Sequence, residues 1–393
     1  MPPIPDRYLL QPVRDDLAEK MVFLGGPRQV GKTTFAKRLA ATDYPGASDY
    51  LNWDNANDRL RILHGKYANG AKLLIFDELH KYRRWKTYIK GEFDVHKDEF
   101  RFLVTGSARL DVYRRGGDSL MGRYRHYRLH PLSVAELCGA GSVAEPFTEL
   151  VFPTAPQAAA ALTALLRHSG FPEPFLRQTD RALRLFHADR TERLVREDIR
   201  DVENIRELSL LETMVALLPS KVGSPFSLNG LREDLGVSHP TAANWADILE
   251  RFYYLFRVYP FQSTLIKSLR KEPKAYLWDW TQVEGPGPRL ENVVGSHLLK
   301  FVHFLRDYQG HDADLSYLRD AEGREVDFLV TVGRKPWFAV EVKTGETKPS
   351  THLRYFASKL KIPFCYQVTA THADFQQDGV RVMPAEKFLA GLA

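Results

Sequence analysis

Short apolar runs alternate with amphipathic segments over roughly the first 135 residues of the chain. The candidate strands in this region are MVFLGG, YLNW, KLLIFD, RFLVTGS and RHYRL, and helical patterns separate them. Strands that alternate with helices are typical of a parallel sheet covered by helices. The sequence therefore predicts an α/β domain at the N-terminal end of the chain.

The pattern changes twice further along the chain. From about residue 145 to 255 it is helical, with turn signals at SGFPEP and PSKVGSPFS. A stretch rich in proline and glycine, KEPKAYLWDWTQVEGPGPRL, then precedes a helical segment. Four further strand patterns follow it, at LSYLRD, EVDFLVTV, WFAVEVK and FCYQVT. This second alternation of helix and strands predicts a separate C-terminal α/β domain.

Composition narrows the class of protein. At 393 residues, two or three domains are expected, and no apolar run approaches the roughly 20 residues that a membrane helix needs. The first residues show no secretory signal, and Cys138 and Cys365 are too far apart in sequence to suggest a redox or zinc motif. A cytoplasmic protein without membrane partners is expected. The net charge of +6 is compatible with a polyanionic partner.

A phosphate-binding motif follows the first strand pattern. Gly26 to Thr33 satisfies G-x-x-x-x-G-K-[ST] between a strand pattern and a helical pattern, which is the context that the motif requires. Its backbone amides would cradle phosphate, Lys32 would reach the β and γ oxygens, and Thr33 would bind Mg²⁺. ATP and Mg²⁺ are the expected cofactors. The candidate nucleotide-binding residues are Gly26, Pro27, Arg28, Gln29, Val30, Gly31, Lys32, Thr33 and Thr34.

Two acidic residues end the apolar run KLLIFDELH. The carboxyl ends of strands are where open α/β sheets bind ligands. Asp77 is therefore expected to hold Mg²⁺ through water, and Glu78 to polarise the attacking water. Ser107, after the next strand, is a candidate sensor of the γ-phosphate, although it could equally close a turn or cap a helix. Arg123 is the candidate arginine finger for a neighbouring subunit, with Arg109 and Arg115 behind it, and a plain surface arginine is the alternative for each.

Several of these stretches together resemble a widespread prokaryotic family of AAA-type ATPases. They are GPRQVGKTT, LIFDELHK, TGSARL, MGRYRHYRLHPLSVAEL and SGFPEP. Members of that family join the ATPase module to a C-terminal domain of unknown function with a restriction-endonuclease-like core. The resemblance covers nearly the whole chain. It implies an AAA-type P-loop domain over residues 1–140, a helical lid or linker over 141–205, a winged-helix segment over 206–272 and a nuclease-like domain over 273–393.

The winged-helix segment has its own pattern of helix, turn and helix. Gly236 supplies the turn, Ser238 caps the next helix, and apolar residues recur on both helical faces. If this segment binds DNA, the second helix offers His239, Thr241 and Asn244 to a groove. The residues expected near phosphates are Arg251, Arg257, Lys267, Arg270, Lys271 and Lys274. Winged helices also serve as lids or protein contacts, which is the alternative.

The C-terminal strands carry the pattern of a PD-(D/E)xK nuclease. Glu341 and Lys343 point to one side of their strand, and the turn at Gly333 brings Asp327 onto the neighbouring hairpin arm. Asp327 and Glu341 would hold a divalent metal ion, and Lys343 would position or activate a water. Glu291, on the preceding helical segment, matches the helix position at which that fold carries an acidic residue. After PK-x-Y this sequence departs from the family, because Asp279 is followed by Trp280 and Thr281.

The first functional interpretation is a Mg²⁺-dependent ATPase that acts on DNA, with branched DNA as one candidate substrate, and that has a nuclease-like module which binds or cuts DNA. A homo-oligomer is expected, since AAA-type sites often depend on a neighbouring subunit. The second reading is a regulatory ATPase switch that binds a protein partner. The third is a nuclease gated by nucleotide.

Overall fold

The computed structural model describes residues 5–106, 120–141, 144–199, 208–262 and 271–392. They form two compact units, which are described separately. The N-terminal unit consists of residues Asp6–His130 and Arg251–Tyr253. The C-terminal unit consists mainly of Pro131–Glu250 and Tyr254–Ala393. Within the described residues, no helix combines the length and apolar character required to cross a membrane.

The N-terminal unit is built on a five-stranded parallel sheet with the order β2-β3-β4-β1-β5. The strands are β1 (Met21–Gly25), β2 (Ser48–Asn52), β3 (Leu73–Asp77), β4 (Arg101–Thr105) and β5 (Tyr124–Arg128). β1 and β3 are buried at every position, so their uninterrupted apolar runs reflect cover on both faces. The predicted α/β fold with a parallel sheet is confirmed.

Helices precede β1 and connect later strands of the sheet. They are α1 (Leu10–Leu17), α2 (Lys32–Asp43), α3 (Ala56–Leu63), α4 (Trp85–His96) and the short 3₁₀ helix η1 (Leu79–Lys81). Asn55 caps α3 through its side chain, which accepts hydrogen bonds from the amides of Asn57 and Asp58. The aromatic side chains of Phe76 and Phe102, on neighbouring strands, stack within the core of this unit.

The C-terminal unit begins with a helical part. Its helices are α6 (Val134–Cys138), α7 (Ala158–His168), α8 (Pro172–Arg177), α9 (Asp180–Arg193), the π-helical η3 (Leu194–Ile199), α10 (Leu208–Leu217), η4 (Leu218–Lys221), α11 (Leu228–Leu235) and α12 (His239–Arg251). A capping box starts α6: the Ser133 hydroxyl accepts from the Glu136 amide, and the Glu136 carboxylate accepts from the Ser133 amide. Lys300 then pairs with Glu136, so this sequence motif is tied into the C-terminal unit.

An eight-stranded mixed sheet follows, in the order β12-β13-β11-β10-β9-β8-β6-β7. Its strands are β6 (Leu255–Pro260), β7 (Lys274–Leu277), β8 (Ala313–Arg319), β9 (Glu325–Val332), β10 (Lys335–Lys343), β11 (Phe364–Thr369), β12 (Phe375–Gln377) and β13 (Val380–Pro384). β6 follows the two helices of the expected winged-helix segment, yet it pairs with β7 and with β8. That segment and the C-terminal strands therefore share one sheet.

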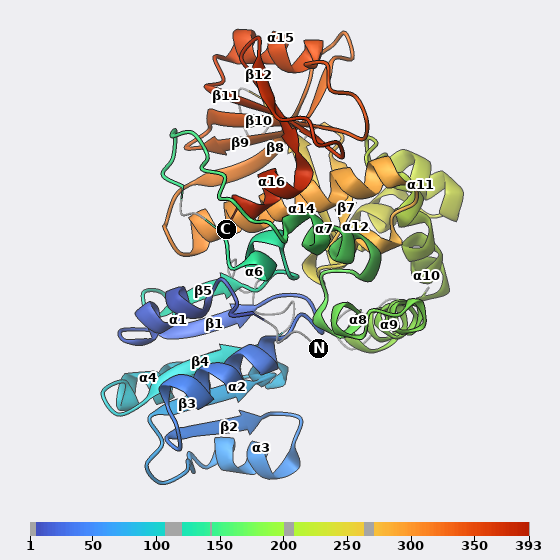
Figure 1. Ribbon diagram of the computed structural model, residues 1–393. Helices are drawn as coiled ribbons and strands as arrows, with labels where there is room; N and C mark the ends of the chain where they lie inside the picture. Colours follow the sequence, from blue (N-terminus) through green and yellow to red (C-terminus); the bar gives the residue numbers. More distant parts are fainter. Residues whose placement is uncertain (1–4, 107–119, 142–143, 200–207, 263–270, 393) are drawn as a thin grey trace. The chain divides into compact units, whose positions relative to one another are not determined.

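Two helices cover opposite faces of this sheet, α14 (Pro286–Asp307) and α15 (Thr351–Leu360) (Figure 1). Successive side chains of β10 point to opposite faces of the sheet. Phe338 contacts Phe301 of α14, whereas Ala339 lies in an apolar cluster with Leu353 and Phe356 of α15. The remaining elements are η5 (Trp280–Gln282) and α16 (Ala385–Ala390). The sheet is thus buried on both faces, as its apolar strands require.

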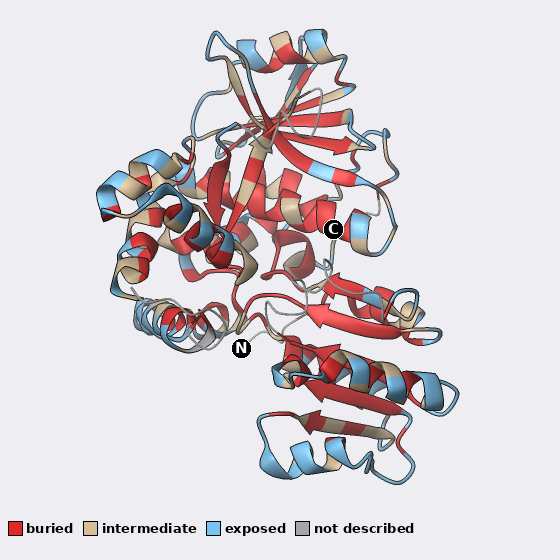
Figure 2. Cartoon of the chain, turned by 180° about the vertical axis from the view of Figure 1, so that it is seen from behind, coloured by how far each residue is buried: buried red, intermediate tan, exposed pale blue. Residues whose placement is uncertain are grey.

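Burial differs sharply between helices (Figure 2). α14 is buried along most of its length, whereas α3 and α9 expose most of their residues. Both the strands and α14 supply the large apolar side chains of the core. A polar side chain that is buried in these elements must find hydrogen-bond partners or a counter-ion inside the protein.

Candidate functional site

The loop between β1 and α2 has the backbone of a phosphate cradle. Gly26 and Gly31 have φ values of 142° and 99°, and Gln29 has a φ of 64°. A Cβ on Gly26 would lie 2.5 Å from the carbonyl oxygen of Leu129, so only glycine fits there. Gly31 gives α2 no side-chain cap, which leaves the first amides of the helix directed at the loop. These features fit a bound polyphosphate.

Lys32 places its ammonium at this loop. The side chain is buried, and its Nζ donates to the carbonyl oxygens of Gly26 at 2.9 Å and Pro27 at 2.7 Å. Both acceptors are neutral, so these two contacts hold the ammonium in place without compensating its charge. This is the arrangement that a lysine needs in order to meet phosphate oxygens.

Asp77 is the central side chain of the candidate magnesium site. It ends β3 and is buried, and both of its carboxylate oxygens accept hydrogen bonds from hydroxyl groups. Thr33 donates to Oδ2 at 2.8 Å, Thr105 donates to Oδ1 at 2.5 Å, and the Tyr50 hydroxyl also donates to Oδ2. The fold thus brings together the two predicted metal ligands, Thr33 and Asp77. Hydroxyl and carboxylate oxygens are the donors that Mg²⁺ prefers.

Glu78 follows Asp77 in a left-handed backbone conformation, with φ of 58°. Its amide donates to the carbonyl oxygen of Thr105 at 3.0 Å, and its Oε2 lies 3.4 Å from Lys81 Nζ and 3.5 Å from His80 Nε2. Burial raises the pKa of Glu78, and the charges of Lys32 and Lys81 offset part of that rise. A non-glycine residue held in this region costs about 1–3 kcal/mol, and such strain concentrates at functional sites.

Of the candidate sensor and the candidate arginine fingers, only Arg123 lies within the described residues. Ser107, Arg109 and Arg115 lie outside the described residues. Arg123 precedes β5, and its Nε lies 2.7 Å from Asp94 Oδ1 on α4. Its guanidinium is therefore engaged within its own unit, at a side chain that is 33% exposed.

The two helices α11 and α12 are joined as the sequence predicts, with Gly236 at φ of 67° and Ser238 accepting a hydrogen bond from the Thr241 amide. His239 and Asn244 are exposed on α12, and Thr241 is half-buried. Arg257, expected near phosphates, instead donates to Glu250 and Asp247 of α12. Of the other expected phosphate contacts, Lys267 and Arg270 lie outside the described residues, whereas Arg251 and Lys271 are within them.

Lys274 is not a surface phosphate contact. Only 1% of its side chain is exposed, and its Nζ lies 2.7 Å from Glu325 Oε1 and 3.2 Å from both Glu291 Oε1 and Asp327 Oδ1. These four residues are called the Lys274 cluster below. Burial by itself lowers the pKa of Lys274, but the charges of Asp327, Glu291 and Glu325 outweigh that effect and raise it. β7 is an edge strand of the sheet, yet it is buried at every position, and the side chain of Lys274 faces these acids.

Other donors fix two acids of the Lys274 cluster. The Tyr276 hydroxyl donates to Glu291 Oε1 at 2.7 Å, and the Val342 amide donates to Asp327 Oδ2 at 2.9 Å. Burial, and next the negative charge of Asp327, raises the pKa of Glu291 to about 7. The candidate metal ligands Glu291 and Asp327 are thus brought together, with an ammonium between them.

Glu341 and Lys343 point to the same side of β10, as the strand alternation predicts. Lys343 Nζ lies 2.8 Å from Glu341 Oε1, while Glu341 Oε2 is buried and has no hydrogen-bond partner within the described residues. Burial, followed by the charge of Asp327, raises the pKa of Glu341 to about 7. Among the described residues, no three histidine, cysteine or acidic side chains are gathered as a metal ion requires. The unpartnered oxygen is the one feature here that favours an added cation.

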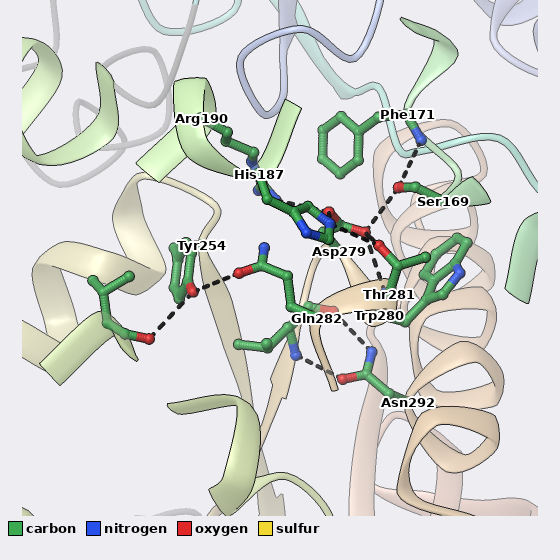
Figure 3. A network of polar contacts seen from close by, with 12 residues as sticks. Ser169, Phe171, His187, Arg190, Tyr254, Asp279, Trp280, Thr281, Gln282 and Asn292 are labelled. Carbon is green, nitrogen blue, oxygen red and sulfur yellow. Dashed lines mark hydrogen bonds and ion pairs between the residues drawn. The ribbon is translucent and has the colours of Figure 1, made fainter. Parts of the chain in front are cut away.

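A second buried polar network surrounds Asp279 (Figure 3). Oδ1 of Asp279 accepts from the hydroxyls of Ser169 at 2.8 Å and Thr281 at 2.6 Å, and Oδ2 lies 3.1 Å from His187 Nε2. Burial raises the pKa of Asp279, but the hydrogen bond and charge of His187 and the charge of Arg190 outweigh burial and hold it below its usual value. This carboxylate therefore joins α9 to the segment after β7.

The SGFPEP motif supports that network. A Cβ on Gly170 would lie 2.5 Å from the ring of Trp280, so glycine is required for the close approach. The Trp280 indole also donates to the carbonyl oxygen of Leu165 at 2.7 Å. The motif thus serves packing in the C-terminal unit.

Sequence reasoning missed several residues that contact the predicted ones. Thr105 ends β4 and Tyr50 lies in the middle of β2. Both strands neighbour β3, so the strand order of the sheet brings their hydroxyls to Asp77. Glu325 lies two residues before Asp327 on the same strand face, which was the available signal for it. Lys274 offered no comparable signal, because its contacts come from β9 and α14, far along the chain.

Family models match three consecutive stretches of the chain. Residues 18–138 match an AAA domain, residues 160–281 match a domain of unknown function (DUF8612), and residues 286–388 match another (DUF4143). The phosphate loop and all five parallel strands lie within the first match. The N-terminal unit is therefore an AAA-type P-loop domain.

Sequence relatives exist in bacteria and archaea. The uncharacterized proteins Rv2008c of Mycobacterium tuberculosis and Mb2031c of Mycobacterium bovis are each 23% identical over 261 residues, which cover 66% of this chain and 54% of the relative. The uncharacterized protein MJ1637 of Methanocaldococcus jannaschii is 24% identical over 220 residues, covering 51% of this chain and 45% of the relative. The chain spans about half the length of these curated relatives.

Solved structures give weaker likenesses. The RuvB Holliday junction branch migration motor of Thermotoga maritima is 20% identical, with 64% of this chain and 87% of that chain covered and a TM-score of 0.31. The ORC1 protein of Aeropyrum pernix, solved in complex with DNA, is 13% identical, with coverages of 71% and 92% and a TM-score of 0.33. TM-scores at this level are too low to support a shared fold or function.

Proposed function

We propose that this chain is a Mg²⁺-dependent ATP hydrolase whose turnover is coupled to DNA, with a C-terminal nuclease-like domain that binds or cleaves DNA. The observation that carries the ATPase part is the carboxylate of Asp77, which accepts from Thr33 next to the phosphate loop and from Thr105 on the neighbouring strand. Three separate segments thus converge on one acid at the carboxyl ends of the strands. Such convergence is typical of a nucleotide site in an open α/β sheet.

The chain's own residues divide the work of hydrolysis. Magnesium-bound ATP, once held there, supplies the terminal phosphoryl group. The amides of residues 26–34 and the Lys32 ammonium bind phosphate oxygens, and Thr33 and Asp77 hold the metal ion. Glu78 orients the attacking water and accepts its proton at the carboxylate, a role that suits an acid whose pKa is raised by burial.

The remaining site roles extend this proposal. Arg123 acts as a finger in a neighbouring subunit's site once it leaves Asp94, and Ser107 senses the γ-phosphate. Once the Lys274 ammonium has moved away from Asp327, Asp327 and Glu341 would hold a divalent ion with Glu291 behind them, and Lys343 would position a water. The pairing of Lys343 with Glu341 and the unpartnered Glu341 oxygen support this last assignment. The exposed polar residues His239 and Asn244 on α12 and the net charge of +6 support a DNA partner.

A regulatory ATPase switch that binds a protein partner is the second candidate. Arg257, expected to contact phosphates, is neutralised by Glu250 and Asp247 of α12. Acidic side chains on the second helix oppose the approach of a phosphate backbone. This pairing favours a protein-facing role for the α11–α12 segment.

One experiment tests the proposal and separates the two candidates. ATP hydrolysis is measured for the wild type and Lys32→Ala with Mg²⁺, alone and with duplex, single-stranded or four-way-junction DNA. We expect turnover that depends on Lys32 and rises with one DNA form. Turnover that depends on Lys32 but ignores every DNA would favour the protein-regulated switch. Equal turnover in both proteins would remove the phosphate loop from its assigned role.

A further inference from the structure

The ammonium of Lys274 is fully used by carboxylates. Its three N–H donors face three acceptors, at 2.7 Å from Glu325 Oε1 and at 3.2 Å from Glu291 Oε1 and Asp327 Oδ1. With 1% of the side chain exposed, water contributes little to its solvation. The protein has therefore placed one permanent cation inside a group of three acids.

The acids of the Lys274 cluster come from different parts of the fold. Glu291 stands on α14, whereas Glu325 and Asp327 stand on β9, and Lys274 itself stands on β7. The Tyr276 hydroxyl and the Val342 amide hold Glu291 and Asp327 in place. Arg319 lies 3.2 Å from Glu325 Oε2, so each of the three carboxylates has a contact other than the one with Lys274.

We propose that Lys274 is the resident cation of this cluster, and that a divalent metal ion and the Lys274 ammonium compete for the same carboxylate oxygens. Carboxylate oxygens are the ligands that Mg²⁺, Mn²⁺ and Ca²⁺ take, although with Lys274 among them these three carboxylates are not gathered as a metal ion requires. The three oxygens that face the ammonium cannot also share one metal ion at about 2.0–2.6 Å, because the ammonium stands where that ion would lie. The inference rests on the proposed nuclease-like role of the C-terminal domain and refines it. Glu291 and Asp327 become metal ligands only when Lys274 is absent or has moved.

Charge supports the same conclusion. One ammonium lies among three carboxylates, of which Glu325 also pairs with Arg319 at 3.2 Å, so removal of the lysine takes away the cation that all three acids share. Buried charges without a counter-ion are strongly unfavourable, so a cluster that lacks Lys274 should take up a divalent cation from solution. The wild type, whose lysine already fills this place, should not.

The test replaces Lys274 in the full-length chain by methionine, which keeps the length of the side chain and removes its charge. Thermal unfolding is recorded in EDTA and in millimolar Mn²⁺, and bound Mn²⁺ is counted by electron paramagnetic resonance. We expect Lys274→Met to melt below the wild type in EDTA and to regain at least about 4 °C with Mn²⁺. It should also bind one more Mn²⁺ per chain than the wild type does.

Lys300→Met is the matched control. Lys300 is as deeply buried in the same unit, and its Nζ lies 3.0 Å from Glu136 Oε2 and 2.6 Å from Ser133 Oγ. Glu136 supplies one carboxylate there, where the Lys274 cluster supplies three. We therefore expect this variant to lose stability without any recovery in Mn²⁺.

Two results would overturn the inference: a Lys274→Met protein whose melting temperature and Mn²⁺ count match those of the wild type with and without metal, or a wild type that Mn²⁺ stabilises as much as the variant. If Lys274→Met alone gives no folded protein, the same comparison is made in the Glu325→Gln background, which carries one charge fewer. Neither readout involves ATP or DNA. A protein without DNA-coupled hydrolysis would leave this inference standing, and the reverse also holds.

Discussion

The two units each bury a lysine near acidic residues, but they surround it differently. In the N-terminal unit, Lys32 donates to two neutral carbonyl oxygens of the phosphate loop. In the C-terminal unit, Lys274 lies among three carboxylates. The contacts of Lys32 leave its positive charge available to an incoming anion, whereas the carboxylates around Lys274 already compensate the charge of that lysine. The same residue type thus prepares one site for phosphate and closes the other to a metal ion.

The acids of the two sites also differ in whether their hydrogen-bond donors are neutral or charged. Asp77 accepts hydrogen bonds from the neutral hydroxyls of Thr33, Tyr50 and Thr105, so its negative charge is oriented but not matched by them. Asp327 accepts from a backbone amide and from the Lys274 ammonium. A metal ion can therefore add to Asp77 by displacing hydroxyl contacts, whereas at Asp327 it must displace a cation.

The largest expected effect contrasts the two lysines directly. In EDTA, Lys274→Met should lower the free energy of unfolding of its unit by about 3–5 kcal/mol, because three partly buried carboxylates lose the cation that they share. Lys32→Met should cost less, because the hydrogen bonds of Lys32 to Gly26 and Pro27 go to neutral acceptors and contribute only about 1 kcal/mol. Urea unfolding of both variants, followed by hydrogen exchange in each unit, measures the difference. Equal losses would break the comparison.

Glu78→Gln should act on rate and leave stability alone. The amide cannot accept a proton, so we expect ATP hydrolysis to fall about 10²-fold or more while ATP binding is kept. Steady-state hydrolysis and equilibrium binding of a fluorescent ATP analogue are the measurements. Glu325→Gln in the Lys274 cluster is the control and should leave hydrolysis unchanged. Unaltered turnover in Glu78→Gln would remove Glu78 from its role.

Thr105→Val should give the smallest effect. It removes the hydroxyl that donates to Asp77 Oδ1 and keeps the shape of the side chain, so we expect a loss of about 10-fold in kcat/KM for ATP. Thr105→Ser, which keeps the hydroxyl, is the control and should retain most activity. The Mg²⁺ dependence should shift to higher concentration in Thr105→Val only. A rate equal to the wild type would show that the Asp77 orientation does not depend on this contact.

Local sequence signals were sufficient for the N-terminal site. The motif from Gly26 to Thr33 is contiguous, and Asp77 follows an apolar run that reads as a buried strand. Their meeting depends only on the parallel order of strands, which the alternation of strands and helices already predicts. Tyr50 was not predicted, because strand order in the sheet, and not sequence distance, makes it a neighbour of Asp77.

The C-terminal site was predictable only in part. The hairpin at Gly333 and the common side of Glu341 and Lys343 follow from turn chemistry and strand alternation. The assignment of β6 to the C-terminal sheet did not follow, because its pairing with β8 joins residues more than fifty positions apart.

By itself, the sequence determined the phosphate loop, the order of strand and helix patterns, and the identity of the acids at the strand ends. These are local properties, since each depends on backbone preference or on alternation within a few residues. The tertiary structure alone decided what each charged side chain faces. Lys274 reads as one more basic residue in a basic stretch, yet the sheet turns it inward to three carboxylates. Charge compensation is a property of spatial neighbours, and those neighbours come from segments that only folding brings together.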